Sequence, residues 1–229
     1  MSTSLRNRPG PALAAAAAVL LVGAIALAFY WVPDDADQGF SQRIFYIHVP
    51  LAITAYACFF WAAWKALRLL WRADERYDLE SYTAVHMGVM FGILTLVTGS
   101  IWARISWGVW WSWSERQLVL FLVLFLFYSA YFMLRYSVDP GPRRARMSAV
   151  YALFGVVLIP VSFLAIRLAE DFIHPVVFTQ RGPQMAGSMF VVFCLSFAGC
   201  LALAGALYQT ELAGKRLDVR LRELRRALA

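Results

Sequence analysis

Charged residues are scarce in this chain. Only 15% of its 229 residues are Asp, Glu, Lys or Arg, whereas 61% are hydrophobic and 16% are aromatic. Soluble globular domains carry about 25% charged residues, so this composition excludes an ordinary soluble protein. The sequence also has no low-complexity tract, no linker and no convincing internal repeat. We therefore expect a single membrane domain.

Cysteine is equally sparse. The three cysteines, Cys58, Cys194 and Cys200, all lie in apolar segments, and none belongs to a Cys-x-x-Cys pair. This pattern argues against a dithiol redox centre and against a covalent Cys-x-x-Cys-His haem site. A closed zinc site needs four ligands, and no cysteine or third histidine accompanies His48 and His174 on the face where we expect them. We interpret the cysteines as small core residues.

Long apolar runs make up most of the sequence. A membrane span takes roughly 20 apolar residues as a helix, and six segments qualify: Ala12–Val32, Val49–Leu70, Thr83–Ala103, Gln117–Leu134, Met147–Ile166 and Ser188–Tyr208. Backbone groups in lipid must bond within the segment, and these runs lack the alternation of a barrel strand. The first run exceeds the apolar core of a cleaved signal peptide, so we expect it to be retained. The predicted fold is an all-α membrane protein with six transmembrane helices, residues 1–208, followed by a tail, residues 209–229.

Lys and Arg are distributed unevenly. The N-terminal segment, the second and fourth loops and the tail hold sixteen of them, and the other three loops hold five. Because positive residues favour the cytoplasm, we expect both termini in the cytoplasm and the first, third and fifth loops outside. The net charge of +7 follows from this asymmetry and needs no nucleic-acid partner.

The tail is basic and amphipathic. It keeps leucines at helical spacing among six Lys and Arg residues; the leucines are Leu217, Leu221, Leu224 and Leu228. This pattern favours a helix on the anionic surface of the lipid bilayer. A docking helix for an ATPase subunit is the alternative.

Tryptophan is concentrated in one loop. Five of the nine tryptophans fall between residues 102 and 113, in a loop expected outside the membrane. Scattered tryptophans in such places anchor proteins to lipid, but this cluster also offers an aromatic platform to a flat apolar ligand. Trp107, Trp110 and Trp111 follow helical spacing, so we expect a short outer-face helix between the third and fourth spans, with Trp113 pointing elsewhere. Gly108 would leave bare backbone beside a ligand.

Histidine occurs three times. His48 and His174 belong to the face that carries the tryptophans, and His86 lies at the start of the third span on the other face. Two imidazoles on separate elements could bind one metal from opposite sides, and haem iron takes axial histidine. We expect His86 to be a hydrogen-bonded residue at a helix end.

The tryptophan run resembles a known signature. Residues 102–116 are similar to the tryptophan-rich "WWD" motif of proteins that handle haem in cytochrome c biogenesis. The preceding run, Val97-Thr98-Gly99-Ser100-Ile101-Trp102, fits the same group, as does Arg43-Ile44-Phe45-Tyr46-Ile47-His48-Val49-Pro50. Six spans and this length resemble the CcmC family, the haem-delivery proteins of system I.

The resemblance implies a site and a function. It implies haem b held at the outer face of the bacterial cytoplasmic (inner) membrane, with His48 and His174 as axial ligands. It assigns stacking on the porphyrin to Trp107, Trp110, Trp111 and Trp113, and propionate contacts to Arg43 and Arg116, as suits a guanidinium beside a carboxylate. The implied partners are the haem chaperone CcmE, the ABC transporter subunits CcmA and CcmB, and the small subunit CcmD.

Two positions depart from the family pattern. The motif usually ends in Asp, where this chain has Ser114 followed by Glu115. A neighbouring residue on a helix points about 100° away, so Glu115 need not replace that carboxylate, although Ser114 could cap a helix. The fifth loop also has Glu170-Asp171-Phe172-Ile173 in place of paired tryptophan before His174.

Two other classes of function remain open at this point. A haem permease would need polar residues along its spans, and the middle positions here are nearly all apolar. A cytochrome c synthase would need a site for an apocytochrome, and little of this chain lies outside the membrane. We therefore expect a haem-binding delivery protein that is not an enzyme.

Overall fold

The structure is a computed structural model that describes residues 9–35, 38–168, 178–179 and 182–228. Long helices dominate it, with one 3-10 turn and one pair of two-residue strands. In chain order the elements are α1 (Pro9–Tyr30), η1 (Phe40–Ile44), α2 (Phe45–Arg72), α3 (Arg76–Trp107), α4 (Arg116–Ser137), α5 (Pro142–Leu168), β1 (Phe178–Thr179), β2 (Gly182–Pro183) and α6 (Gly187–Leu228).

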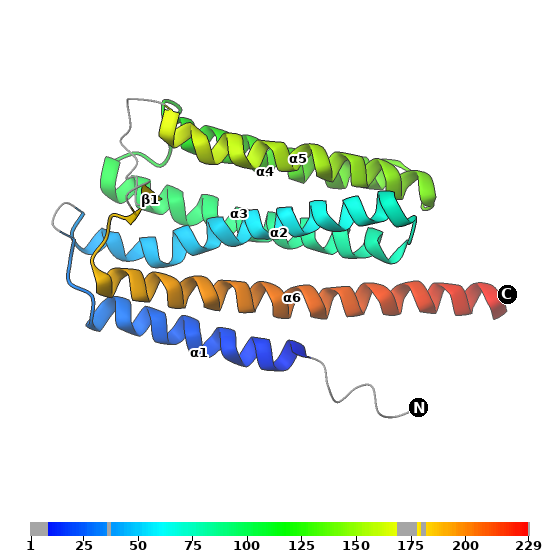
Figure 1. Ribbon diagram of the computed structural model, residues 1–229, viewed down its shortest axis with the longest axis horizontal. Coiled ribbons are helices and arrows are strands. Elements are labelled where there is room, and N and C mark those ends of the chain that lie inside the picture. Colours follow the sequence, from blue (N-terminus) through cyan, green and yellow to red (C-terminus); the bar gives the residue numbers. More distant parts are fainter. Residues whose placement is uncertain (1–8, 36–37, 169–177, 180–181, 229) are drawn as a thin grey trace.

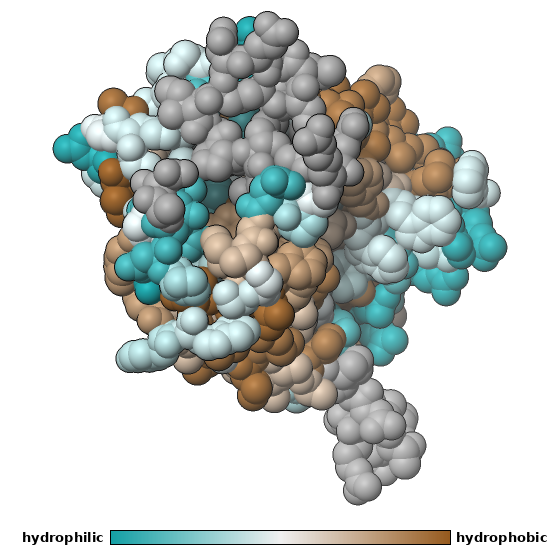
Figure 2. Space-filling view, turned by 60° about the vertical axis from the view of Figure 1, so that its left-hand side comes forward, coloured by the Kyte–Doolittle hydropathy of each residue, from teal (hydrophilic) through white to brown (hydrophobic). Residues whose placement is uncertain are grey.

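The six predicted spans are confirmed as helices. All six of these helices are long and apolar enough to cross a membrane. They run up and down alongside one another, so the first and third loops lie at the same end of the bundle as the end of α5 and the start of α6 (Figure 1). We call this the loop end, and the opposite end, which carries the α2–α3 and α4–α5 turns, the turn end. Figure 2 shows apolar side chains over the flanks of the helices, as expected for a surface that faces lipid.

The helices pack in a simple order. α2 and α3 form the centre. α6 lies against them and α1 packs on the outer side of α6, whereas α4 and α5 form a hairpin on the other side of the central pair (Figure 1). In the core, the rings of Phe59 on α2 and Tyr128 on α4 stack at 3.8 Å. The Tyr56 hydroxyl of α2 lies 3.1 Å from the Ser162 hydroxyl of α5. The buried core therefore connects α2 to both helices of the hairpin.

The predicted helix in the tryptophan loop is wrong. α3 itself continues to Trp107, and residues 108–115 form an irregular loop. Gly108 ends α3 because it adopts the left-handed conformation, with φ 75°, which suits glycine and terminates a helix. Glu115 is extended just before α4 begins. Helical spacing of three tryptophans is too short a pattern to outweigh this glycine.

Two helix boundaries also differ from expectation. α2 begins at Phe45, so His48 lies inside its first turn and not in the loop before it. α3 begins at Arg76, which places His86 well inside this helix and not at its end. The structure also contains the β1–β2 pair, with Phe178 opposite Pro183 and Thr179 opposite Gly182; two residues per strand leave no periodic signal in a sequence.

The basic tail is the end of α6. This helix runs without interruption from Gly187 to Leu228 and extends past the other helices at the turn end (Figure 1). A helix lying flat on the membrane would need a bend after Tyr208, and the structure has none. The tail therefore extends along the axis of the sixth span, with its four leucines exposed.

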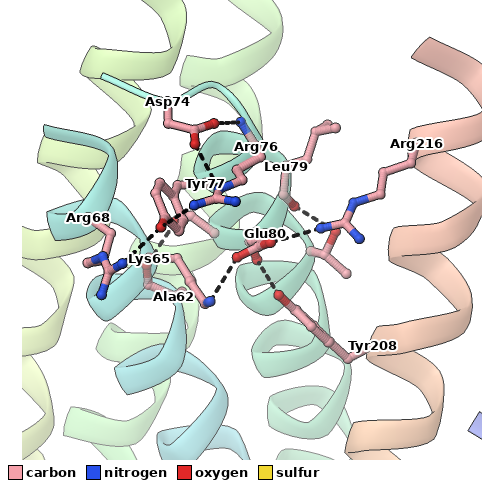
Figure 3. A network of polar contacts seen from close by, with 12 residues as sticks. Ala62, Lys65, Arg68, Asp74, Arg76, Tyr77, Leu79, Glu80, Tyr208 and Arg216 are labelled. Atoms are coloured by element: carbon pink, nitrogen blue, oxygen red, sulfur yellow. Dashed lines mark hydrogen bonds and ion pairs between the residues drawn. The ribbon is translucent and has the colours of Figure 1, made fainter. Parts of the chain in front are cut away.

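Charged side chains join the helices at the turn end. Glu80 of α3 forms ion pairs of 2.8 Å with Lys65 of α2 and with Arg216 of α6, as Figure 3 shows. The Tyr208 hydroxyl of α6 donates a hydrogen bond of 3.4 Å to the Glu80 carbonyl oxygen. This network holds α6 against the central pair as far as Arg216.

Candidate haem site

The residues expected to bind haem come from separate elements at the loop end. His48 lies in the first turn of α2, and the tryptophans lie at the end of α3 and in the loop before α4. These positions are 50 or more residues apart in sequence, and the up-and-down arrangement brings their segments to one end of the bundle (Figure 1). His174 lies outside the described residues, so its place as the second ligand stays a prediction.

His48 is held against α3. Its Nδ1 lies 3.0 Å from the Thr98 hydroxyl oxygen. The same hydroxyl oxygen lies 2.8 Å from the Leu94 carbonyl oxygen and 3.2 Å from that of Thr95, to which it can donate its proton. The imidazole of His48 is therefore fixed by a side chain of the neighbouring helix.

The next residue of α3 gives the imidazole its space. A Cβ atom on Gly99 would lie only 2.8 Å from Cε1 of His48, closer than two carbon atoms can pack. The ring thus lies directly over the backbone of α3. Only glycine leaves room for this approach.

The aromatic cluster begins one turn after Thr98. Trp102 is four residues further along α3, so it lies on the same face of the helix. Its ring packs edge to face on Trp107, with centroids 4.9 Å apart. The Trp102 indole nitrogen donates a hydrogen bond of 3.3 Å to the Gln38 side chain. The first loop, the end of α3 and His48 therefore share one face of the bundle.

The tryptophans of the loop differ in exposure. Trp110 and Trp113 are 60% and 73% exposed, whereas Trp107 and Trp111 are half-buried. Trp111 packs edge to face on Trp113 at 5.8 Å. Its indole N–H is buried and has no hydrogen-bond partner in the described part of the chain. Two indoles thus keep most of their surface exposed to a flat ligand, and a third has a buried donor without a partner among the described residues.

The two candidate arginines occupy different surroundings. Arg43 forms an ion pair with Asp34, and its Nε donates a hydrogen bond of 3.1 Å to the Ala28 carbonyl oxygen at the end of α1. A propionate would have to compete with Asp34 for this guanidinium. Arg116 is exposed at the first position of α4 and forms no ion pair with any described residue. Arg116 is therefore the more accessible cation beside the tryptophans.

The end of the tryptophan motif is rearranged. Ser114 does not cap α4, because its hydroxyl lies 2.8 Å from the Ser112 hydroxyl and the first turn has no side-chain cap. Glu115 is only 3% exposed, so its carboxylate turns into the protein. The carboxylate near the end of the motif thus belongs to Glu115, one residue after the position of the family's Asp, and it points inward.

His86 belongs to a different part of the molecule. Its Nδ1 lies 2.8 Å from a carboxylate oxygen of Glu211 on α6, far along α3 from the tryptophans. The prediction that His86 is hydrogen-bonded is confirmed, although it is not at a helix end.

Sequence reasoning missed the support of His48. Thr98 and Gly99 were noticed only as part of a family-like run, and no local pattern links them to a histidine 50 residues away. The available signal was the adjacent pair of a hydroxyl and a glycine, Thr98-Gly99, one helical turn before Trp102. Gln38 and Glu115 carried no signal of this kind.

Comparison with known proteins identifies the family of this chain. The family model described as Heme exporter protein C (CcmC) matches residues 1–227. Proteins of that name include one from Paracoccus denitrificans, 31% identical over 96% of this chain and 90% of its own length. The Bradyrhizobium diazoefficiens protein is 31% identical over 97% of this chain and 83% of its own length. The Escherichia coli K12 protein is 35% identical over 66% of this chain and 61% of its own length. This chain, with six helices fit to span a membrane, belongs to the Heme exporter protein C family, which handles haem in cytochrome c biogenesis.

Proposed function

We propose that this protein binds haem b at its loop end and delivers it to the haem chaperone CcmE. The loop end faces the outside of the bacterial cytoplasmic membrane. The protein works as a binding and delivery component beside CcmA, CcmB and CcmD, and it performs no catalytic step itself. His48 and His174 are the axial ligands, and the tryptophan loop covers the porphyrin.

One observation carries this proposal. His48 of α2 contacts Thr98 of α3, and Trp102 lies one turn further along the same face of α3. An imidazole therefore lies beside a cluster of indoles. A haem needs both, because its iron takes imidazole nitrogen and its ring buries apolar surface against aromatic faces.

The other residues at this end fit the same cargo. Haem propionates are carboxylates, and the exposed Arg116 can pair with one of them. The buried indole N–H of Trp111 is a further donor at the loop. The charge distribution supports the outward orientation, because the positive residues concentrate at the turn end.

The visible absorption spectrum of the purified full-length protein tests the proposal. We expect a six-coordinate, bis-imidazole spectrum, and a pyridine haemochrome assay should identify haem b. Replacing His48 or His174 with Ala should lower the haem content or leave five-coordinate iron. His86→Ala is the matched control, since its ring bonds Glu211 at the other end, and it should retain the wild-type spectrum. Wild-type spectra in both ligand variants would refute the assignment.

Co-purification tests the delivery step. The wild-type protein should retain CcmE when haem is present, and His48→Ala should retain less. Retention of apocytochrome instead of CcmE would point to a cytochrome c synthase and would contradict the proposal.

A further inference from the structure

The hydrogen bond between His48 and Thr98 indicates which ring nitrogen of His48 carries the proton. The Thr98 hydroxyl carries one hydrogen and lies near three possible partners: the carbonyl oxygens of Leu94 and Thr95 at 2.8 and 3.2 Å, which can only accept, and Nδ1 of His48 at 3.0 Å, which can accept or donate. Threonine inside a helix commonly donates to the carbonyl four residues earlier. With its proton directed to Leu94, the Thr98 oxygen can only accept from His48.

This direction fixes the tautomer of His48. A neutral imidazole has one N–H and one nitrogen with a lone pair. If Nδ1 donates to Thr98, then Nε2 carries the lone pair that a metal requires. Histidines that bind metals generally donate their other ring N–H to a neighbouring acceptor, which fixes the tautomer and the ring orientation.

The adjacent Gly99 restrains the ring at its Cε1 edge. The imidazole lies over the Gly99 backbone, where a Cβ would approach Cε1 to 2.8 Å. Thr98 therefore sets the hydrogen bond, and Gly99 sets how deeply the ring lies against α3. Two consecutive residues thus determine both the rotation and the position of one side chain.

We propose that Thr98 and Gly99 are positioning residues that keep the proton of His48 on Nδ1 and present its Nε2 to the haem iron. This proposal rests on the proposed function only for the identity of the metal, because the tautomer belongs to the protein without haem. The acceptor at Nδ1 also makes the imidazole a stronger donor, which favours ferric over ferrous iron.

The decisive variants differ by a single hydroxyl. Thr98→Val removes the acceptor and keeps the shape, and Thr98→Ser restores the acceptor. Thr95→Val is the matched control, because the Thr95 hydroxyl bonds its own helix at the Phe91 carbonyl oxygen, 2.9 Å away, one turn before Thr98. Gly99→Ala tests the second restraint independently.

Haem titration provides the first measurement. Losing a hydrogen-bond partner of a metal ligand typically weakens binding about 10- to 100-fold, so Thr98→Val should bind haem that much more weakly. Its bound haem should also have a more positive reduction potential. Thr98→Ser and Thr95→Val should match wild type in both properties, and Gly99→Ala should weaken binding. The melting temperature of the haem-free protein should change little in the threonine variants.

The tautomer can be read without haem. The chain has three histidines, so nitrogen-15 histidine labelling gives few NMR signals in detergent, and His48→Ala assigns the signal of His48. Neutral His48 should carry its proton on Nδ1 in the wild type and in Thr98→Ser. In Thr98→Val it should shift to the Nε2–H form that is usual in water.

The outcomes separate this inference from the proposed function. Wild-type haem affinity in Thr98→Val, or a proton on Nε2 in the wild type, would overturn the inference. Weaker haem binding that Thr98→Ser fails to restore, or that follows a matching loss of melting temperature, would indicate a structural role and would also overturn it. If His48→Ala binds haem with the wild-type affinity and spectrum, the assignment of His48 as an axial ligand fails, whereas the NMR result still decides the tautomer.

Discussion

At the scale of single residues, the four tryptophans of the motif have different surroundings. Trp107 packs on Trp102, and Trp111 packs on Trp113 with its N–H buried. Trp110 and Trp113 present most of their surface. A ligand at this loop would therefore bury chiefly the two exposed indoles, while the half-buried pair holds the shape of the loop.

We predict that Trp110→Ala and Trp113→Ala each weaken haem retention. Burying one large aromatic side chain contributes about 1–3 kcal/mol, and the axial histidines would still hold the iron. Phe at either position should recover much of the loss, because an aromatic face remains. The measurement is the haem dissociation constant of the purified variants.

Trp71→Ala is the matched control for these variants. Trp71 is 69% exposed, close to the 73% of Trp113, but it lies at the other end of the bundle, near the end of α2. It should leave haem affinity unchanged. Equal effects from Trp71→Ala and Trp113→Ala would mean that the tryptophans serve only as lipid anchors.

At the scale of helices, one buried ion pair attaches the α4–α5 hairpin to α3. Arg135 of α4 makes two hydrogen bonds, of 2.7 and 2.6 Å, to the two carboxylate oxygens of Asp78 on α3. The Arg135 side chain is 3% exposed, and its guanidinium lies over the Tyr82 ring at 4.3 Å. A bidentate pair in this setting sets the position of one helix relative to the other.

We predict that Arg135→Met strongly destabilises the protein. Removing one partner leaves the Asp78 carboxylate without its counter-charge, which typically costs about 3–5 kcal/mol for a buried pair. The double variant Asp78→Leu with Arg135→Met should recover part of this loss, because no uncompensated charge remains. Thermal or denaturant unfolding in detergent measures the effect.

An exposed pair in the same turn region gives the comparison. Arg76 and Asp74 are 57% and 39% exposed and lie 2.8 Å apart. Arg76→Met should cost at most about 1 kcal/mol, as for other surface ion pairs. A similar cost for Arg76→Met and Arg135→Met would show that burial of the Asp78 pair contributes nothing extra.

At the scale of the whole molecule, the orientation in the membrane follows from charge. The alternation of six helices places the ends of α1, α3 and α5, after which the first, third and fifth loops begin, at one end of the bundle (Figure 1). Five Lys and Arg residues belong to those loops and sixteen to the other segments. Since positive residues remain in the cytoplasm, we expect the loop end outside.

Reporter fusions measure this orientation. An enzyme active only outside the cytoplasm should function when fused after Trp113 or His174, and it should be inactive after Arg76 or Arg144. A reporter active only in the cytoplasm should give the opposite pattern. The reverse result would place the haem site in the cytoplasm and would contradict delivery at the outer face.

The sequence alone established the class of this protein. Each span is long and apolar by itself, so hydropathy identified all six, and the tryptophan motif identified the family. Local spacing failed to predict the backbone where one residue determines it. Gly108 ends α3 and leaves the tryptophans that follow it in an irregular loop. The continuation of α6 through the tail was missed because the change from apolar to charged residues resembles a boundary.

Only the tertiary structure decided which side chains meet. The pairs His48–Thr98 and Arg135–Asp78 join residues that are 50 and 57 positions apart. No local sequence pattern predicts which residue each of them contacts. In a membrane, lipid is as apolar as the helix surfaces, so hydropathy does not specify which faces pack together. Close approach at small residues and single hydrogen bonds make that choice, and such contacts exist only after the helices have assembled.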